Sequence, residues 1–154
     1  MYKINIKNKA DYYAIINYLF KICDKFKIVS LHSGIKNIEG LRFIDKLNGY
    51  CIEEKLVRKW PGMVKGPKSN MKIYPFNKET LKLLEEYKNF FEYKVEDNIG
   101  YYGSFDSNEQ IDISFYNGEV CILYTICHEG LCISEDKGLK EILYKKNIEI
   151  EEWI

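Results

Sequence analysis

Residues 111–134, with the sequence IDISFYNGEVCILYTICHEGLCIS, decide the fold, because this is the longest apolar run in the chain and two turn signals divide it. Asn117-Gly118 is a preferred type I′ hairpin dipeptide, since both central residues of that turn need positive φ. Glu129-Gly130 is a weaker turn signal. The run therefore predicts a three-stranded antiparallel meander with strands at about 111–116, 119–127 and 131–134.

The spacing of apolar residues elsewhere predicts helices and further strands around this meander. We expect helices over residues 10–24, 78–91 and 137–145, and a shorter one over 41–47 that Asn48-Gly49 ends in the left-handed conformation. Short strands are expected at 2–6, 27–32, 55–60, 71–76 and 148–154, the fourth of them an edge strand because of Pro75. Polar, glycine-containing loops are expected at 62–70 and 94–110. The expected architecture is a single α+β domain of residues 1–154, with an antiparallel β-sheet centred on the meander (111–134) and helices packed on one face.

The overall charge and the terminal sequence exclude several classes of protein. The 154 residues hold 23 basic and 23 acidic side chains, which argues against a nucleic-acid binder that works by neutralising phosphates. No apolar segment has the length of a signal peptide or a membrane span, so we expect a cytoplasmic protein without a membrane contact. In a reducing compartment, five scattered cysteines are most simply buried small hydrophobic residues.

His128-Glu129-Gly130-Leu131-Cys132 looks at first like the zinc-protease pattern H-E-x-x-H, in which two ligands lie one helical turn apart. Gly130 and the surrounding strand-forming residues argue against a helix, and no third ligand can be named. A structural zinc cluster of Cys121, Cys127, His128 and Cys132 lacks the C-x2-C knuckle, and on a strand His128 points away from the cysteines. We therefore predict no metal and no cofactor.

Catalysis by a Cys–His pair has little support in the sequence. His32 and His128 are the only histidines, and the adjacent Cys127 and His128 would point apart on a strand, which is the wrong geometry for proton transfer. We expect His128 to close a β-turn, with its ring hydrogen-bonded to a carboxylate or a backbone group. The carboxylates, Asp112 among them, have no spacing that selects a catalytic pair, so most of them are interpreted as solvated charges.

Aromatic residues are the better candidates for a binding surface. Trp60, before Pro61-Gly62, is either a core anchor at a strand end or part of a cleft beside the 62–70 loop. Tyr101 and Tyr102, on a loop flanked by glycines, are expected to be exposed and to act as an interface hot spot.

Three segments together resemble a group of small bacterial domains without an agreed activity. They are Arg58-Lys59-Trp60-Pro61-Gly62, Asp112-Ile113-Ser114-Phe115-Tyr116 and Thr125-Ile126-Cys127-His128-Glu129. In that group a W-P-G turn precedes a segment like E-D-L-x-F-[FY], and a strand then ends in T-x-[SA]-H-E. This chain departs from the pattern at Gln110-Ile111, where the group has Pro-Glu, and at Ile122, where it has Trp. Similar small domains accompany polymorphic toxins as immunity proteins, and the resemblance selects Trp60, His128 and Glu129 for testing.

The sequence thus favours a non-enzymatic cytosolic bacterial binding protein, an immunity or accessory protein that occludes a protein partner. The binding residues expected are Trp60, Tyr101, Tyr102, His128 and Glu129. The alternative is a small hydrolase or transferase that uses His128 with a carboxylate such as Glu129.

Overall fold

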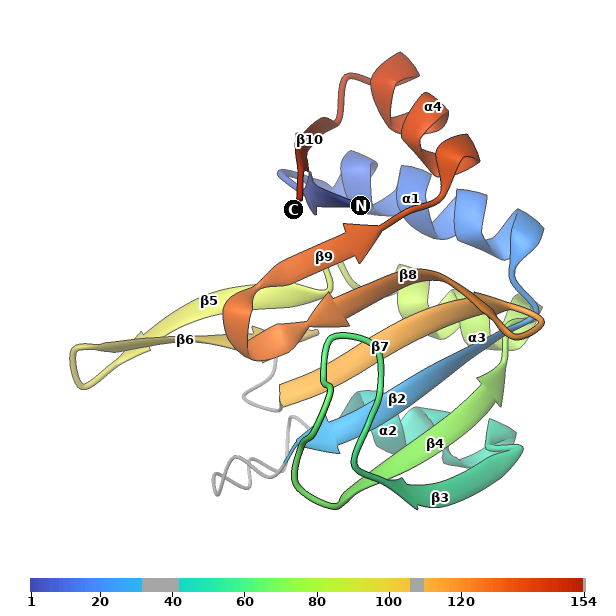
Figure 1. The fold of residues 1–154 in the computed structure, drawn as a ribbon, viewed down its shortest axis with the longest axis vertical. Coiled ribbons are helices and arrows are strands. Elements are labelled where there is room, and N and C mark those ends of the chain that lie inside the picture. Colours follow the sequence, from blue (N-terminus) through green and yellow to red (C-terminus); the bar gives the residue numbers. More distant parts are fainter. Residues whose placement is uncertain (32–41, 106–109, 154) are drawn as a thin grey trace.

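An eight-stranded antiparallel sheet forms the body of the protein in a computed structural model that describes residues 1–31, 42–105 and 110–153 (Figure 1). Its strands lie in the order β10 (Glu149–Glu152), β1 (Tyr2–Asn5), β9 (Leu131–Ser134), β8 (Val120–Ile126), β7 (Gln110–Asn117), β2 (Lys25–Leu31), β4 (Ser69–Pro75) and β3 (Glu53–Val57). The predicted meander is β7, β8 and β9, in the middle of this order. Its first turn lies one residue later than the predicted type I′ turn: Gly118 and Glu119 connect the paired residues Asn117 and Val120. Of the two, only Gly118 has a positive φ, at 62°, as in a type II′ turn.

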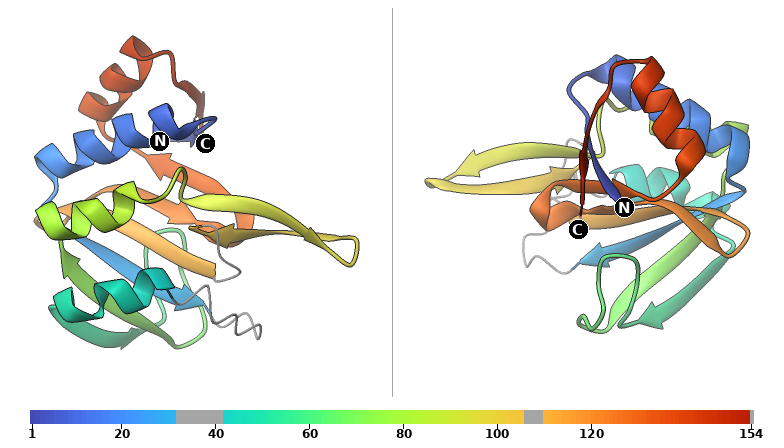
Figure 2. Two further views of the ribbon diagram at one scale, coloured as in Figure 1. Left: turned by 180° about the vertical axis from the view of Figure 1, so that it is seen from behind. Right: turned by 45° about the horizontal axis from the view of Figure 1, so that its top comes forward.

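Within the described residues four α-helices accompany the sheet, and Figure 2 shows α1, α2 and α3 lying across one of its faces. They are α1 (Lys9–Ile22), α2 (Arg42–Leu47), α3 (Lys78–Glu85) and α4 (Lys137–Lys145). Phe115 and Leu123, a cross-strand pair of β7 and β8, are fully buried on this face. They belong to one apolar core with residues from all four helices, such as Ile15 and Leu139. The α+β architecture and the helical covering of one face are as predicted.

A hairpin of β5 (Phe91–Glu96) and β6 (Ile99–Ser104) projects from the body of the protein (Figure 1). The predictions of a loop over 94–110 and of a helix reaching 91 are wrong. Helix α3 ends at Glu85 because hydroxyl groups of α1 cap its last turn: Tyr12 Oη donates to the carbonyl of Leu84 at 2.6 Å and Tyr13 Oη to that of Glu85 at 2.7 Å.

The turn of this hairpin explains how a polar segment forms two strands. Asp97 and Asn98 have φ values of 50° and 66°, the pair of left-handed residues that a type I′ turn needs. Asp and Asn tolerate this conformation better than other non-glycine residues, so Asp97-Asn98 was a turn signal that the sequence prediction missed.

Three smaller predictions also need correction. Strand β4 is an inner strand, because Pro75 is its last residue and the edge strand β3 pairs only as far as Ile73. Gly49 does not adopt positive φ; the chain continues from α2 into a 3-10 turn, η2 (Asn48–Tyr50). Strand β3 ends at Val57 and not near residue 60, because the following segment leaves the sheet. His32 lies outside the described residues.

Candidate functional site

The connection between β3 and β4, residues 58–68, folds across the face of the sheet that the helices leave open (Figure 1). Trp60 is its anchor: the side chain is 5% exposed and packs with Val29 and Met71 in a small second core. A backbone bridge joins Trp60 to Met63 and makes the Pro61-Gly62 turn between them, where Gly62 has a φ of 87°. Both interpretations of Trp60 hold, since it is a buried anchor and its loop also forms one wall of a groove.

Asp112 connects this loop to the turn that carries His128. Its Oδ2 accepts a hydrogen bond from Trp60 Nε1 at 2.9 Å, and its Oδ1 accepts one from the backbone N–H of Cys127 at 2.9 Å. Asp112 is 4% exposed, and this burial raises the pKa of its carboxyl group, although the two hydrogen bonds oppose the rise. Asp112 is therefore not one of the solvated charges expected among most of the carboxylates. Three segments that are distant in the sequence meet at this carboxylate.

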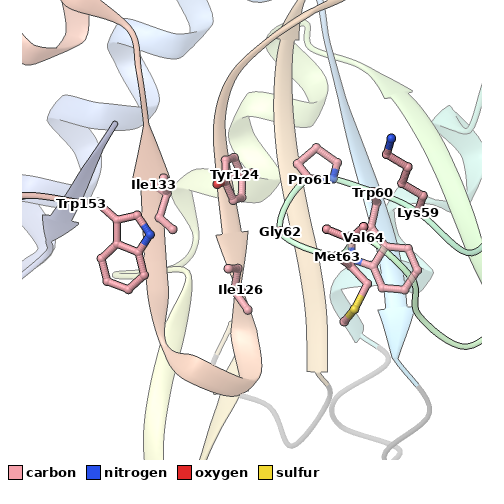
Figure 3. Close-up of a pocket in the computed structure, with 10 residues that line it drawn as sticks. All are labelled: Lys59, Trp60, Pro61, Gly62, Met63, Val64, Tyr124, Ile126, Ile133 and Trp153. Carbon is pink, nitrogen blue, oxygen red and sulfur yellow. The ribbon is translucent and has the colours of Figure 1, made fainter.

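An apolar groove of about 730 Å³ runs along the open face of the sheet (Figure 3). Residues 59–64 form one wall, and Tyr124, Ile126, Ile133 and Trp153 form the floor and the opposite wall. Tyr124 and Ile133 are cross-strand partners on β8 and β9. Both point away from the helical core, because the adjacent residues Leu123 and Cys132 point into it. We refer to these ten residues as the apolar groove.

A cleft beside Trp60 and the 62–70 loop was one of the two interpretations of the sequence, but Tyr124, Ile126, Ile133 and Trp153 were not predicted to line it. The signal available was the run Val120–Ile126, in which every residue except Thr125 is apolar or aromatic. Such a strand is buried on both faces, which implies that something covers the face opposite the helices. Sequence alone does not show that the cover is residues 58–68, because that contact joins segments far apart in the chain.

His128 and Glu129 lie on a 3-10 turn, η3 (Cys127–Glu129), which Gly130 ends at a φ of 63°. The turn is as predicted, and it places no second ligand one helical turn from His128. Both side chains are exposed, and His128 Nε2 lies 3.7 Å from Glu129 Oε1, too far for the expected hydrogen bond. Neither residue lines the apolar groove, although Ile126 of the groove directly precedes their turn.

Tyr101 and Tyr102 lie in strand β6, not in a loop, and both are half-buried. The ring of Tyr102 covers Gly130 so closely that a Cβ atom there would lie 2.7 Å from the ring. Tyr102 thus attaches the hairpin to the His128 turn. The exposed apolar side chains of the hairpin are instead Tyr93, Val95 and Ile99, which are 60%, 66% and 68% exposed.

The thiols near this region are poor nucleophiles. Cys127 Sγ is buried, accepts a hydrogen bond from Ser104 Oγ at 2.9 Å, and has a pKa that burial raises to about 11. Cys132 is also buried, and burial raises its pKa as well. Cys23 is buried too, whereas Cys51 and Cys121 are only half-buried. Across residues 1–31, 42–105 and 110–153, no three His, Cys, Asp or Glu side chains come together as metal ligands do.

The chain matches no family model, and comparisons with curated proteins and with solved structures give no significant match. In the part of the chain that the structure describes, no helix is both long and apolar enough to cross a membrane.

Proposed function

We propose that this chain is a non-enzymatic binding protein that occludes the surface of a protein partner, in the manner of an immunity or accessory protein. The observation that carries the proposal is the position of an exposed apolar hairpin beside the apolar groove. Contiguous exposed apolar surface is uncommon on monomeric proteins, and it marks sites of interaction.

The groove, the His128 turn and the hairpin are continuous. Ile126 lines the groove, the next three residues form η3, and Tyr102 packs the base of the hairpin on Gly130. The exposed polar side chains of His128 and Glu129 lie on this turn, between the apolar groove and the hairpin. Protein interfaces likewise combine aromatic residues with polar, solvated side chains.

The geometry gives less support to a hydrolase or transferase that uses His128. A catalytic histidine needs a nucleophile within hydrogen-bond reach and a third group that orients its ring. Here the ring is exposed, its acidic neighbour Glu129 is 3.7 Å away, and the thiol of Cys127 is directed to Ser104 and the carbonyl of Tyr102. An exposed His–Glu pair of this kind suits the rim of a binding surface better than a reaction centre.

Site-specific photo-crosslinking tests the proposal. A photoreactive phenylalanine analogue replaces Tyr93 on the hairpin or Val64 on the groove wall, and Tyr144 on α4 is the matched control because it is as exposed as Tyr93. In an extract of the source organism, we expect positions 93 and 64 to give an adduct of the same discrete mass and position 144 to give none. Excess unlabelled chain should compete the adduct away.

Two results would contradict the proposal. One is equal labelling at positions 93, 64 and 144, which indicates non-specific capture. The other is the absence of a competed adduct from both positions 93 and 64.

A further inference from the structure

Residues 58–68, RKWPGMVKGPK, hold four basic side chains and no acidic one. Arg58, Lys59, Lys65 and Lys68 are all exposed. Within the described part of the chain, none of the four forms an ion pair with a carboxylate. Lysines elsewhere do so, such as Lys3 with Glu151 at 3.5 Å and Lys140 with Glu152 at 2.6 Å. Residues 58–68, of which 59–64 form one wall of the apolar groove, therefore carry positive charge that no carboxylate of the described residues pairs with.

The strands next to this loop add to the positive charge on the same face. Lys27 of β2 lies between Phe26 and Ile28, which point into the helical core, so its side chain emerges on the open face of the sheet. There its Nζ lies 4.3 Å from the centroid of the Tyr116 ring. Burial lowers the pKa of Lys27, and the nearby charges of Lys55 and Lys25 lower it further. The charge of Glu119 raises the pKa of Lys27 and so opposes this lowering. Glu119 Oε1, however, lies 3.6 Å from Lys25 Nζ and thus already has a cationic partner.

From this arrangement we propose that the apolar groove binds an acidic segment of a protein partner. An aromatic or branched apolar side chain of that segment enters the groove between Trp153 and the loop, and its neighbouring carboxylates face the basic side chains of residues 58–68. This inference rests on the proposed function and adds the chemistry of the partner. The apolar centre provides affinity, whereas the charged wall selects the partner and speeds its association.

The same loop is poorly suited to a single-stranded nucleic acid, which needs aromatic faces on which bases stack. The ring of Trp60 is not free, because Gly66 lies so close that a Cβ atom there would be 2.8 Å from the ring. The whole chain has a formal charge of zero. A second copy of this chain is the other possible occupant, because the hairpin tip Val95-Glu96-Asp97-Asn98-Ile99 is itself apolar and acidic.

Selection from a phage-displayed library of random dodecapeptides tests the chemistry of the partner and does not require that the partner be identified first. We expect the enriched peptides to be net negative and to contain an aromatic or branched residue. Their binding, measured with the synthetic fluorescein-labelled peptide, should weaken as salt rises.

Two charge variants separate the loop from a general effect of net charge. Lys65→Glu/Lys68→Glu should weaken the selected peptide about tenfold or more, because two rim contacts become repulsive. Lys78→Glu/Lys88→Glu, which changes the net charge equally at exposed positions elsewhere, should change the affinity less than about twofold. Trp153→Ala should also abolish tight binding, since it opens one wall of the groove.

Several outcomes overturn the inference. The first is a selection in which no peptide is enriched, and the second is a set of enriched peptides without an acidic bias. The third is an equal loss of peptide affinity in the two charge variants. If fluorescein-labelled oligo-dT binds more tightly than the selected peptide, and its binding depends on Lys65 and Lys68, the loop would be assigned to nucleic acid. Self-association in sedimentation that Lys65→Glu/Lys68→Glu abolishes would assign the groove to a second copy. If the crosslinks from positions 93 and 64 appear but the acidic bias does not, the proposed function stands and only this inference fails.

Discussion

Trp60→Phe removes the indole N–H that holds the β3–β4 loop to Asp112, while it keeps an aromatic ring in the same place. In the variant, Asp112 Oδ2 stays buried and loses its 2.9 Å hydrogen-bond donor. Nothing else in the described surroundings replaces that donor. The variant should therefore be measurably less stable than the wild type.

The size of the effect follows from two contributions. A net contribution of about 1.5–3 kcal/mol is typical of a hydrogen bond to a charged group. The smaller ring leaves a gap against Val29 and Met71 that costs about 1 kcal/mol more. Together they predict a loss of about 2.5–4 kcal/mol, or a fall in Tm of about 5–15 °C for a domain of this size.

The pH dependence gives an independent check. The bond to Trp60 lowers the pKa of Asp112, so its removal raises that pKa above the already raised wild-type value. When the folded-state pKa of a carboxyl group is higher in a variant than in the wild type, the variant is the less stable protein only at a pH at which that group is ionised. The deficit of Trp60→Phe should be full at neutral pH and should shrink as the pH falls through the folded-state pKa of Asp112.

Urea unfolding of a double-mutant cycle measures the bond itself. The cycle combines Trp60→Phe with Asp112→Ala. The single and the double variant that carry Asp112→Ala both lack the acceptor of the Cys127 N–H, so the free energy of that lost hydrogen bond cancels. We expect a coupling energy of about 1.5–3 kcal/mol. Trp153→Phe, at a partly exposed tryptophan, is the control and should cost less than about 0.5 kcal/mol. A coupling energy near zero would refute the assignment of Asp112 as the connection between the loop and the His128 turn.

Three further predictions concern single positions. Gly130→Ala should lower the thermal stability of the protein more than Gly118→Ala does. Both glycines have φ near 60°, but only a Cβ atom at position 130 meets the ring of Tyr102. In a Tyr102→Ala background, the difference in Tm between the two glycine variants should disappear. Tyr74→Phe should stabilise the protein by about 1 kcal/mol in urea unfolding, since Tyr74 Oη is buried and has no hydrogen-bond partner in the described part of the chain. Asp112→Asn should be destabilised relative to the wild type by more at pH 3 than at pH 7. The reason is that the folded-state pKa of Asp112 is raised, so the wild type loses stability as the pH rises through that pKa. A stability deficit that grew with pH would contradict the burial of Asp112 as the cause.

The sequence predicted those elements whose signals are local. The Asn117-Gly118 signal predicted the hairpin of β7 and β8, although the turn itself consists of Gly118 and Glu119. The spacing of Leu139, Ile142 and Leu143 predicted helix α4 with its observed ends at Lys137 and Lys145. Two failures have different causes: the local turn signal Asp97-Asn98 was missed, whereas distant residues decide where helix α3 ends. Helix α3 stops where Tyr12 and Tyr13 of another helix reach its carbonyl groups, and no pattern within residues 78–91 shows that.

The candidate site was predictable only in part for the same reason. Trp60 was identified from its turn, and the His128 turn from Gly130. The carboxylate that joins them, Asp112, looks like any other acidic residue in the sequence. Its role depends on two partners that are 52 and 15 residues away along the chain.

The two ends of the described chain lie side by side (Figure 1), and the N–H of Trp153 donates a hydrogen bond to the carbonyl of Met1 at 2.9 Å. Because Trp153 also forms a wall of the apolar groove, any tag or fusion attached at either end emerges next to that groove. Immobilising the protein through its ends would hold the groove against the support and mask weak ligands. Attachment through the exposed side of α4, at Tyr144, keeps the groove accessible. A short linker between the two ends would also give a circular permutant whose new ends open elsewhere.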